Sequence, residues 1–426
     1  MKIIENPLLE SLPELLQRPA MDHTALYTVV QGVLDGVKKE GDKAVASYTK
    51  AFDGVTMDHT LVTEAEINEA ALEVAPALKE AIQLAAKNIR CFHEAQVSEQ
   101  VKIETMPGVN CWRKSIGIDK VGLYIPGGSA PLFSTVLMLG IPAVIAGCKQ
   151  IILCTPPAAN GKVHPAILYA ASVVGIKSMY KIGGVQAIAA MAFGTETVPK
   201  VYKIFGPGNQ YVTAAKQLVQ QTGVAIDMPA GPSEVCVLAD ETCNPVFVAS
   251  DLLSQAEHGA DSQVLLVSTS KKVVAEVKEA LAAQLAVLPR KDIAQKALDN
   301  STAIVVEDME RAIFIVNSYA AEHLIIACKN EDVVAEQITN AGSVFLGNYS
   351  PESLGDYASG TNHTLPTSGY ARAYSGVSVD SFVKKVTFQK LTQAGLQAIG
   401  TAVETMAAAE GLDAHKNAIT IRLQSL

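Results

Sequence analysis

The stretch KVGLYIPGGS (residues 120–129) decides the fold class of this chain. Its first six residues are mostly apolar and predict a buried strand; the Pro and Gly residues predict a tight turn, and the segment up to Leu139 predicts a helix. The same order recurs later. Further strands are expected at Gln150–Cys154, Ser178–Ile182, Lys203–Phe205, Gln263–Ser268, Leu324–Cys328 and Ser343–Leu346. Strands that alternate with helices are typical of α/β proteins, in which a parallel sheet carries helices on both faces.

The two ends of the chain differ from this alternating middle. Residues 1–20 predict a short helical arm, and apolar residues at helical spacing predict helices from about 24 to 100. Residues 348–376 are rich in Gly, Ser, Asn, Thr and Tyr, and a loop of that length is either functional or disordered. Helical sequence resumes near residue 380 and ends in an apolar tail at 419–423. A length of 426 residues favours two or three domains.

The composition argues against several classes of protein. Lys and Arg number 34 against 43 Asp and Glu, and the net charge of −9 argues against nucleic-acid binding. The charge-free stretch 121–148 is interrupted by Pro126, Pro131 and Pro142, so it predicts no membrane-spanning helix. The first residues lack a basic segment followed by an unbroken apolar run, and we expect a cytoplasmic protein without a signal peptide. The seven cysteines are scattered without a CxxC motif, which favours buried, reduced thiols.

Polar residues with catalytic or metal-binding potential gather in the last two-fifths of the chain. They are Gln255 and His258, the adjacent Glu322 and His323, Asp356 and His363 in the long loop, and Glu410 and His415 near the end. Gln255 and His258 are three residues apart near the end of an expected helix, so both can reach one ion. Imidazole, carboxamide and carboxylate groups together suit a borderline divalent cation, zinc first. The Glu-His pair offers a separate proton acceptor.

Each of these features also has an ordinary structural interpretation. Gln255 and His258 are compatible with a polar helix end, Glu322-His323 with a surface pair, and Asp356 with a turn. A residue as close to the terminus as His415 is normally exposed and inert. The glycine turns after the first strands can present N–H groups to phosphates, but none is a GxGxxG motif, and tight turns occur in any α/β fold.

Eight segments considered together resemble the histidinol dehydrogenase family. In chain order they are GLYIPGGSAPLFSTVLMLGIPA, KIFGPGN, AIDMPAGPSEV, ASDLLSQAEHG, EHLI, AGSVFLG, SPESLGDYASGTNHTLPT and AAAEGL followed by DAHKNA. They run in order from about residue 120 to 420, which makes a chance match implausible. The resemblance implies oxidation of L-histidinol to L-histidine through histidinaldehyde, with two NAD and one water consumed.

The resemblance also implies roles for individual residues. The ligands of one zinc ion per subunit would be Gln255, His258, Asp356 and His415 of the partner subunit. The substrate would contact these four residues together with Ser233, His323, His363 and Glu410. NAD would contact Tyr124, Gln186 and Asn209.

The architecture expected from this resemblance has two Rossmann-like domains with incomplete parallel sheets, and small helical extensions at both ends. The N-terminal helical arm covers 1–22. The first α/β domain covers 23–120 and 235–377 and carries most of the zinc site, and the second covers 121–234 on the NAD side. The helical tail 378–426 would reach the partner subunit, so we expect a domain-swapped homodimer with shared active sites.

The chemistry predicts how the Glu-His pair would act. Loss of hydride from a carbinol carbon requires removal of its hydroxyl proton, and His323 is the expected base because neutral imidazole titrates near working pH. Glu322 would then activate the water that attacks the aldehyde. Alternatives are another zinc- and NAD-dependent amino-alcohol dehydrogenase, a zinc hydrolase, and a solute-binding protein with a metal in its cleft. The missing secretion signal and the Glu-His pair count against the last of these.

Overall fold

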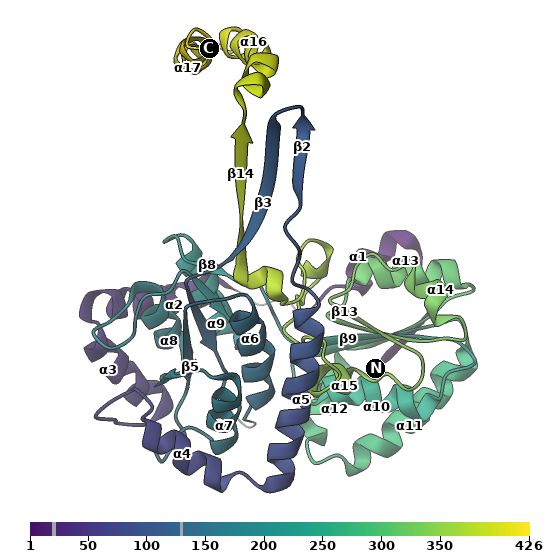
Figure 1. The fold of residues 1–426 in the computed structure, drawn as a ribbon. Coiled ribbons are helices and arrows are strands. Elements are labelled where there is room, and N and C mark those ends of the chain that lie inside the picture. Colours follow the sequence, from purple (N-terminus) through teal and green to yellow (C-terminus); the bar gives the residue numbers. More distant parts are fainter. Residues whose placement is uncertain (19–22, 128–130) are drawn as a thin grey trace.

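Two parallel β-sheets with helices on both faces form the body of the molecule, and a long antiparallel arm projects from it (Figure 1). This computed structural model describes residues 1–18, 23–127 and 131–426. The predicted α/β class with parallel sheets is confirmed. Within the described residues, no helix combines the length and apolar character needed to span a bilayer.

The six-stranded sheet lies in the lobe that contains the N-terminus. All its strands are parallel, in the order β1 (Lys2–Glu5), β11 (Thr302–Val305), β10 (Gln263–Ser268), β9 (Glu234–Ala239), β12 (His323–Ala327) and β13 (Ser343–Leu346). The central strands are buried along their whole length, as expected for a parallel sheet covered on both faces. One face packs against α10 (Pro245–Ala256), α11 (Lys271–Val287) and α12 (Lys291–Asp299). The other face packs against α1 (Leu12–Leu15), α13 (Met309–Tyr319) and α14 (Glu331–Ala335).

The five-stranded sheet forms the second lobe. Its parallel strands follow the order β6 (Ser178–Lys181), β5 (Gln150–Thr155), β4 (Lys120–Tyr124), β7 (Lys203–Phe205) and β8 (Ala225–Ile226). After β4 the chain first adds β5 and β6 on one side of that strand, and it later adds β7 and β8 on the other side. The order of strands therefore reverses between β4 and β7, and the carboxyl edge at such a switch point is where α/β proteins bind ligands.

In the described part of the chain, eight helices cover the faces of this second sheet. One face carries α4 (Glu64–Glu73), α5 (Pro76–Glu94), α6 (Phe133–Ile145) and α7 (Pro165–Val174). The other face carries α2 (His23–Glu40), α3 (Asp42–Asp53), α8 (Gly184–Phe193) and α9 (Gln210–Gln220). This packing departs from the expectation that residues 23–120 and 235–377 form one domain. Helical periodicity shows that a helix has a buried face, but not which sheet that face covers.

The arm is a three-stranded antiparallel sheet that the sequence analysis missed. It consists of β2 (Lys102–Met106), β3 (Val109–Gly117) and β14 (Val383–Leu391), and it ends in the helical hairpin of α16 (Gln393–Ala409) and α17 (Asp413–Leu423) (Figure 1). The expectation of helix from about residue 380 was therefore wrong for β14. Neither face of this strand is covered by the body, so its sequence lacks the apolar run of a buried strand.

The N-terminal segment also differs from the expected helical arm. Residues 2–5 form the edge strand β1, parallel to β11, and the helical part is one turn of α1. Residues 19–22 of the expected arm lie outside the described residues, as do Gly128 and Ser129 of the expected turn. The polar loop at 348–376 contains a short helix, α15 (Glu352–Tyr357), that composition did not predict.

A buried ion pair fixes the turn that follows β7. Lys216 of α9 and Asp227 after β8 pair with side chains only 5% and 1% exposed. Asp227 Oδ2 accepts a hydrogen bond from Gly206 N at 2.8 Å, and Lys216 Nζ donates one to Gly206 O at 2.8 Å. Gly206 has φ +125°, and a Cβ there would lie 2.1 Å from Tyr124 O. The ion pair therefore holds the carboxyl edge of β7 tightly against that of β4.

We predict that Asp227→Asn lowers the free energy of unfolding by about 3–5 kcal/mol, because it leaves the buried Lys216 ammonium without a counter-charge. Urea unfolding followed by circular dichroism measures the change. The matched control is Asp119→Asn, which removes the acid of the exposed ion pair with Lys149 (side chains 45% and 81% exposed). That control should leave the unfolding midpoint unchanged. Equal midpoints for the two variants would contradict the structural role of the buried pair.

Candidate active site

Most of the expected catalytic and metal-binding residues lie at the amino edge of the six-stranded sheet. β9 begins at Glu234 and β12 begins at His323. Helix α10 runs back from the carboxyl end of β9 and brings Gln255 and His258 to the same edge. Helices α10 and α13 both end here, and the partial negative charge of a helix C-terminus favours a cation.

The backbone of Glu234 holds both members of the Glu322-His323 pair. The Glu234 N–H donates to Glu322 Oε2 at 2.9 Å. His323 Nδ1 lies 3.2 Å from Glu234 O, which can only accept, so Nδ1 carries the proton. The side chains of Glu322 and His323 are 9% and 4% exposed. The sequence indicated a pair at a strand mouth, and the structure places both members inside the protein.

The second ring nitrogen of His323 faces Asp356. His323 Nε2 lies 3.3 Å from Asp356 Oδ1, although the two atoms are not aligned as a hydrogen bond. Burial would lower the pKa of His323, but the carboxylates of Glu322 and Asp356 outweigh it and raise that pKa. Burial raises the pKa of Glu322, against the opposing effect of His323. A proton received at His323 Nε2 is therefore stabilised by the charges around it.

Asp356 and His363 come together although the chain between them is irregular. His363 Nδ1 lies 2.8 Å from Asp356 O, and His363 Nε2 lies 3.1 Å from Thr135 Oγ1. Thr135 belongs to the first turn of α6 on the other sheet. His363 therefore links the amino edge of the six-stranded sheet to the carboxyl edge of the five-stranded sheet. Ser233, directly before β9, lies at the same amino edge.

The sequence analysis missed Glu352, a further buried acid of this site. Its side chain lies one turn before Asp356 in α15, and the residue is 1% exposed. Glu352 Oε1 accepts a hydrogen bond from Ser254 Oγ, next to Gln255. Burial raises the pKa of Glu352, opposed mainly by His323. The four-residue spacing of Glu352 and Asp356 could have indicated that both acids belong to the site. That spacing places two side chains on one face only if the segment is helical.

The residues of one chain fit part of a metal site. Among the described residues, no three His, Cys, Asp or Glu side chains lie close enough to hold an ion. Among the predicted zinc ligands that the body of the chain supplies, only His258 and Asp356 are of these four residue types. Gln255 Oε1 and Asp356 Oδ1 are buried, and neither has a hydrogen-bond partner in the described part of the chain. Buried oxygen atoms without partners fit a cation that takes a further ligand from outside the chain.

The expected tail residues lie elsewhere in the same chain. Glu410 ends α16 and His415 lies in α17, and both are exposed. These helices sit at the tip of the arm, far from the six-stranded sheet of their own chain (Figure 1). The structure therefore brings together Gln255, His258, Glu322, His323, Asp356 and His363, but neither tail residue.

The residues expected to contact NAD lie at the carboxyl edge of the five-stranded sheet. Tyr124 ends β4, and its hydroxyl accepts a hydrogen bond from Gly184 N at 3.0 Å. Gln186 is fully buried in α8, where Nε2 donates to Asp53 and Oε1 has no hydrogen-bond partner in the described part of the chain. Asn209 caps α9 by accepting from the N–H groups of two residues in its first turn. This edge and the free oxygen of Gln186 fit a nucleotide cofactor.

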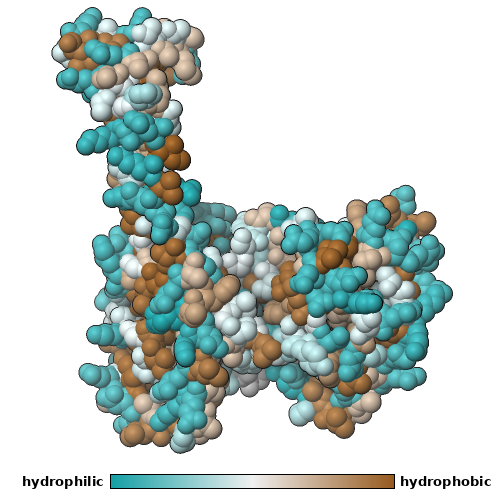
Figure 2. All heavy atoms as spheres, turned by 45° about the vertical axis from the view of Figure 1, so that its right-hand side comes forward, coloured by the Kyte–Doolittle hydropathy of each residue, from teal (hydrophilic) through white to brown (hydrophobic). Residues whose placement is uncertain are grey.

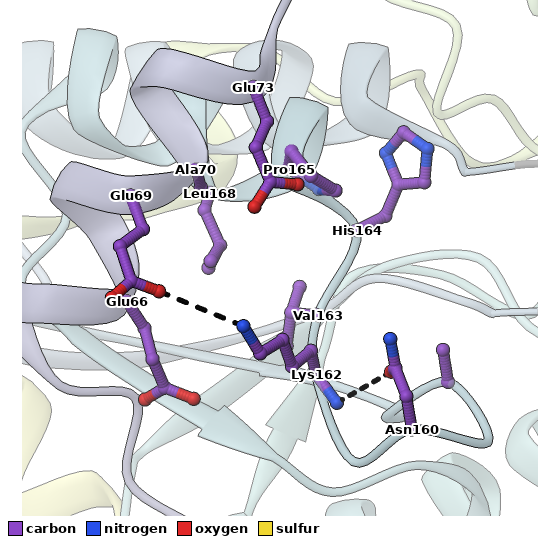
Figure 3. Close-up of a pocket in the computed structure, with 11 residues that line it drawn as sticks. Glu66, Glu69, Ala70, Glu73, Asn160, Lys162, Val163, His164, Pro165 and Leu168 are labelled. Atoms are coloured by element: carbon purple, nitrogen blue, oxygen red, sulfur yellow. Dashed lines mark hydrogen bonds and ion pairs between the residues drawn. The ribbon is translucent and has the colours of Figure 1, made fainter.

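A separate small cavity of about 160 Å³ lies between α4 and the segment before α7 (Figure 3). Three of its charged side chains have partners: Glu69 lies 3.7 Å from Lys162, and Glu66 lies 2.9 Å from Lys181. None of its lining side chains carries a buried polar atom without a partner. This cavity therefore lacks the features that mark the sheet-edge site.

Comparisons with known proteins identify the family of this chain. The family model described as histidinol dehydrogenase matches residues 16–423. Histidinol dehydrogenase of Bacteroides thetaiotaomicron is 61% identical over 426 residues, 100% of both chains, and that of Mannheimia succiniciproducens is 53% identical over 97% of this chain and 96% of its own. The crystal structure of histidinol dehydrogenase from Elizabethkingia anophelis superposes with a TM-score of 0.98 at 57% identity, covering 100% of this chain and 98% of that one. The chain belongs to the histidinol dehydrogenase family.

Proposed function

We propose that this protein is a cytoplasmic, zinc- and NAD-dependent enzyme that oxidises L-histidinol to L-histidine through L-histidinaldehyde, completing histidine biosynthesis. The observation that carries the proposal is the buried Glu322-His323 pair, with His323 Nε2 directed at Asp356 beside Gln255 and His258. Family membership supplies the substrate, and the pair supplies the proton chemistry that the substrate requires.

Gln255, His258 and Asp356 would hold the zinc, with His415 of the partner subunit as the fourth protein ligand. When bound, zinc acts as a template that positions the imidazole and amino groups of histidinol. Ser233 and His363, with Glu410 of the partner subunit, would make the remaining contacts to the substrate. Ser233 and His363 lie at the edge where the metal ligands meet, which supports that assignment.

His323 takes the hydroxyl proton of the substrate at Nε2. Its Nδ1 is occupied by Glu234 O, so Nε2 is the nitrogen free to accept. The first hydride leaves to NAD and produces the aldehyde. Glu322 then removes a proton from the attacking water while His323 returns its proton to the aldehyde oxygen, which gives the hydrate. His323 accepts a hydroxyl proton of that hydrate as the second hydride leaves to a second NAD. Burial of the pair keeps bulk water away from the aldehyde between the two steps.

NAD would lie along the carboxyl edge of the five-stranded sheet, in contact with Tyr124, Gln186 and Asn209. The hydrogen bond between His363 and Thr135 supports this placement, because it joins that edge to the Glu322-His323 site. A substrate held by His363 would therefore be close to that edge.

The arm supports a homodimer in which each tail completes the partner's site. Its sheet is uncovered on both sides, and an open groove of about 890 Å³ runs along one face beside the stacked rings of Trp112 and Phe388. Exposed apolar side chains mark the arm and its tip (Figure 2), among them Ile103, Met406 and Ile421. Apolar surface of this kind is typical of an interface with another chain. The distance of the tail from its own body supports a role in a partner's site.

We predict that the purified protein forms NADH from NAD with histidinol and not with simple alcohols. Spectrophotometry should give two NADH per histidine formed, and chelation should abolish the signal until zinc is restored. NADH formation from other amino alcohols at similar kcat/KM would favour the broader dehydrogenase alternative. Hydrolysis without NADH would favour the zinc hydrolase.

We predict that His323→Asn lowers kcat for both oxidations by about 10²–10⁴-fold, because it removes the base but keeps a side chain of similar size. Histidinol and histidinaldehyde are assayed separately, and bound zinc is measured by mass spectrometry. Zinc content should be retained. The matched control is His59→Asn, an exposed histidine on the other lobe that also follows an acidic residue, which should keep wild-type kcat. Wild-type turnover in His323→Asn would remove this residue from the mechanism.

Shared sites predict complementation between two inactive chains. A mixture of His323→Asn and His415→Asn chains should regain up to about a quarter of wild-type activity, since half of randomly mixed dimers are hybrid and each hybrid has one intact site. The chains are unfolded, mixed and refolded together, with each variant refolded alone as the control. No recovery in a verified hybrid would show that each tail serves its own body.

A further inference from the structure

We propose that Glu234 is a positioning residue for the Glu322-His323 pair and that Arg18 holds it in place, which makes the N-terminal segment part of the catalytic apparatus. The inference rests on the proposed function for the roles of Glu322 and His323. Neither Glu234 nor Arg18 was selected from the sequence, and neither is expected to touch the substrate. Their contribution would be to fix the Glu234 backbone that orients the two reacting side chains.

The carboxylate of Glu234 is the meeting point of three segments. Arg18 Nε and Nη2 donate to its two oxygens at 3.0 and 2.9 Å, forming a bidentate pair whose side chains are 17% and 2% exposed. Ser368 N donates to Glu234 Oε1 at 2.7 Å. A buried fork of this kind fixes the orientation of a carboxylate more tightly than a single ammonium contact does.

Arg18 is itself held rigidly. Its Nη2 also donates to Tyr319 O at 2.7 Å, and its guanidinium lies 3.9 Å from the centre of the Tyr319 ring. Tyr319 is the last residue of α13, three residues before Glu322. The same arginine therefore anchors the start of β9 and the helix end that leads into the catalytic pair.

The contact with Ser368 extends this framework to the loop that carries His363. Ser368 has φ +54°, an unusual value for a residue other than glycine. Thr367 Oγ1 accepts a hydrogen bond from Gly231 N, so the loop is joined to the segment before β9 at two adjacent points. A strained backbone persists only where its surroundings determine it, and here Glu234 supplies one of those constraints.

Both reacting side chains depend on the backbone of a single residue, Glu234. Movement of Glu234 N would release Glu322, and movement of Glu234 O would release His323 Nδ1 and with it the tautomer that leaves Nε2 free. A displacement of about 1 Å at a catalytic group can cost about 100-fold in rate. Substrate and NAD contacts lie on other residues, so the loss should fall on kcat and not on KM.

The test compares Arg18→Lys and Glu234→Gln with the matched control Arg372→Lys. Arg18→Lys keeps the positive charge but loses the bidentate hydrogen bonds to Glu234. Glu234→Gln keeps the size and shape of the side chain but loses its negative charge. Arg372 donates to Ser318 O, the carbonyl next to that of Tyr319, and has no contact with Glu234. We expect kcat to fall about 10- to 100-fold in the first two variants, with KM for histidinol and NAD within about twofold of wild type and kcat of the control unchanged.

The ring of His323 provides a readout that does not depend on turnover. In protein labelled with ¹⁵N-histidine, the resonances of His323 are assigned by their loss in His323→Asn. In the wild type they should show a protonated Nδ1 in a hydrogen bond. In Arg18→Lys and Glu234→Gln this signal should shift or broaden, while the control keeps it.

Several results would overturn the proposal. They are unchanged kcat in both variants, a rise in KM without a fall in kcat, and a fall in kcat while the His323 signal stays in place. If Arg18→Lys fails to fold, Glu234→Gln decides by the same criteria. Failure of the proposed function can be distinguished from failure of the positioning role. In the former case the wild type would not oxidise histidinol, but the His323 signal would still respond to both substitutions.

Discussion

The backbone of Glu234 at the start of β9 is the constraint on which the site depends. Its N–H binds Glu322 and its carbonyl binds His323, so the two peptide groups that flank one Cα set the orientation of both side chains. That residue lies at the end of a fully buried strand in the middle of a parallel sheet. The proposed catalytic pair thus takes its rigidity from the core of the lobe, which is what proton transfer between fixed atoms requires.

The two sheets use opposite edges. The Glu322-His323 site lies at the amino edge of the six-stranded sheet, where helices α10 and α13 end, and a cation suits those helix ends. The expected NAD contacts lie at the carboxyl edge of the five-stranded sheet, where its strand order reverses. His363 joins the two edges through Asp356 and Thr135. A metal and a nucleotide can therefore be bound by different lobes and still meet at one substrate.

The sequence predicted the buried strands well, because a parallel strand covered on both faces is a continuous apolar run such as Gln263–Ser268. It failed for the arm, whose strands face solvent, and for α15, whose polar sequence resembles a loop. Motifs located the Glu-His pair and the neighbours Gln255, His258 and Asp356. They did not reveal Glu352, Arg18 or Glu234, whose importance comes from burial and pairing with distant residues. They also could not assign α2–α5 to a sheet, since periodicity does not identify the surface that a helix covers.

The central claim is that the site at the amino edge is a zinc site completed by a second subunit. Within one chain His415 lies in α17 at the tip of the arm, while Gln255 Oε1 and Asp356 Oδ1 are buried and have no hydrogen-bond partner among the described residues. The most direct measurement is anomalous diffraction at the zinc edge from crystals of the zinc-loaded protein. The account predicts one anomalous peak per subunit, within ligand distance of Gln255, His258, Asp356 and the partner's His415. A peak bound by other residues, or bound by His415 of the same chain, would contradict it.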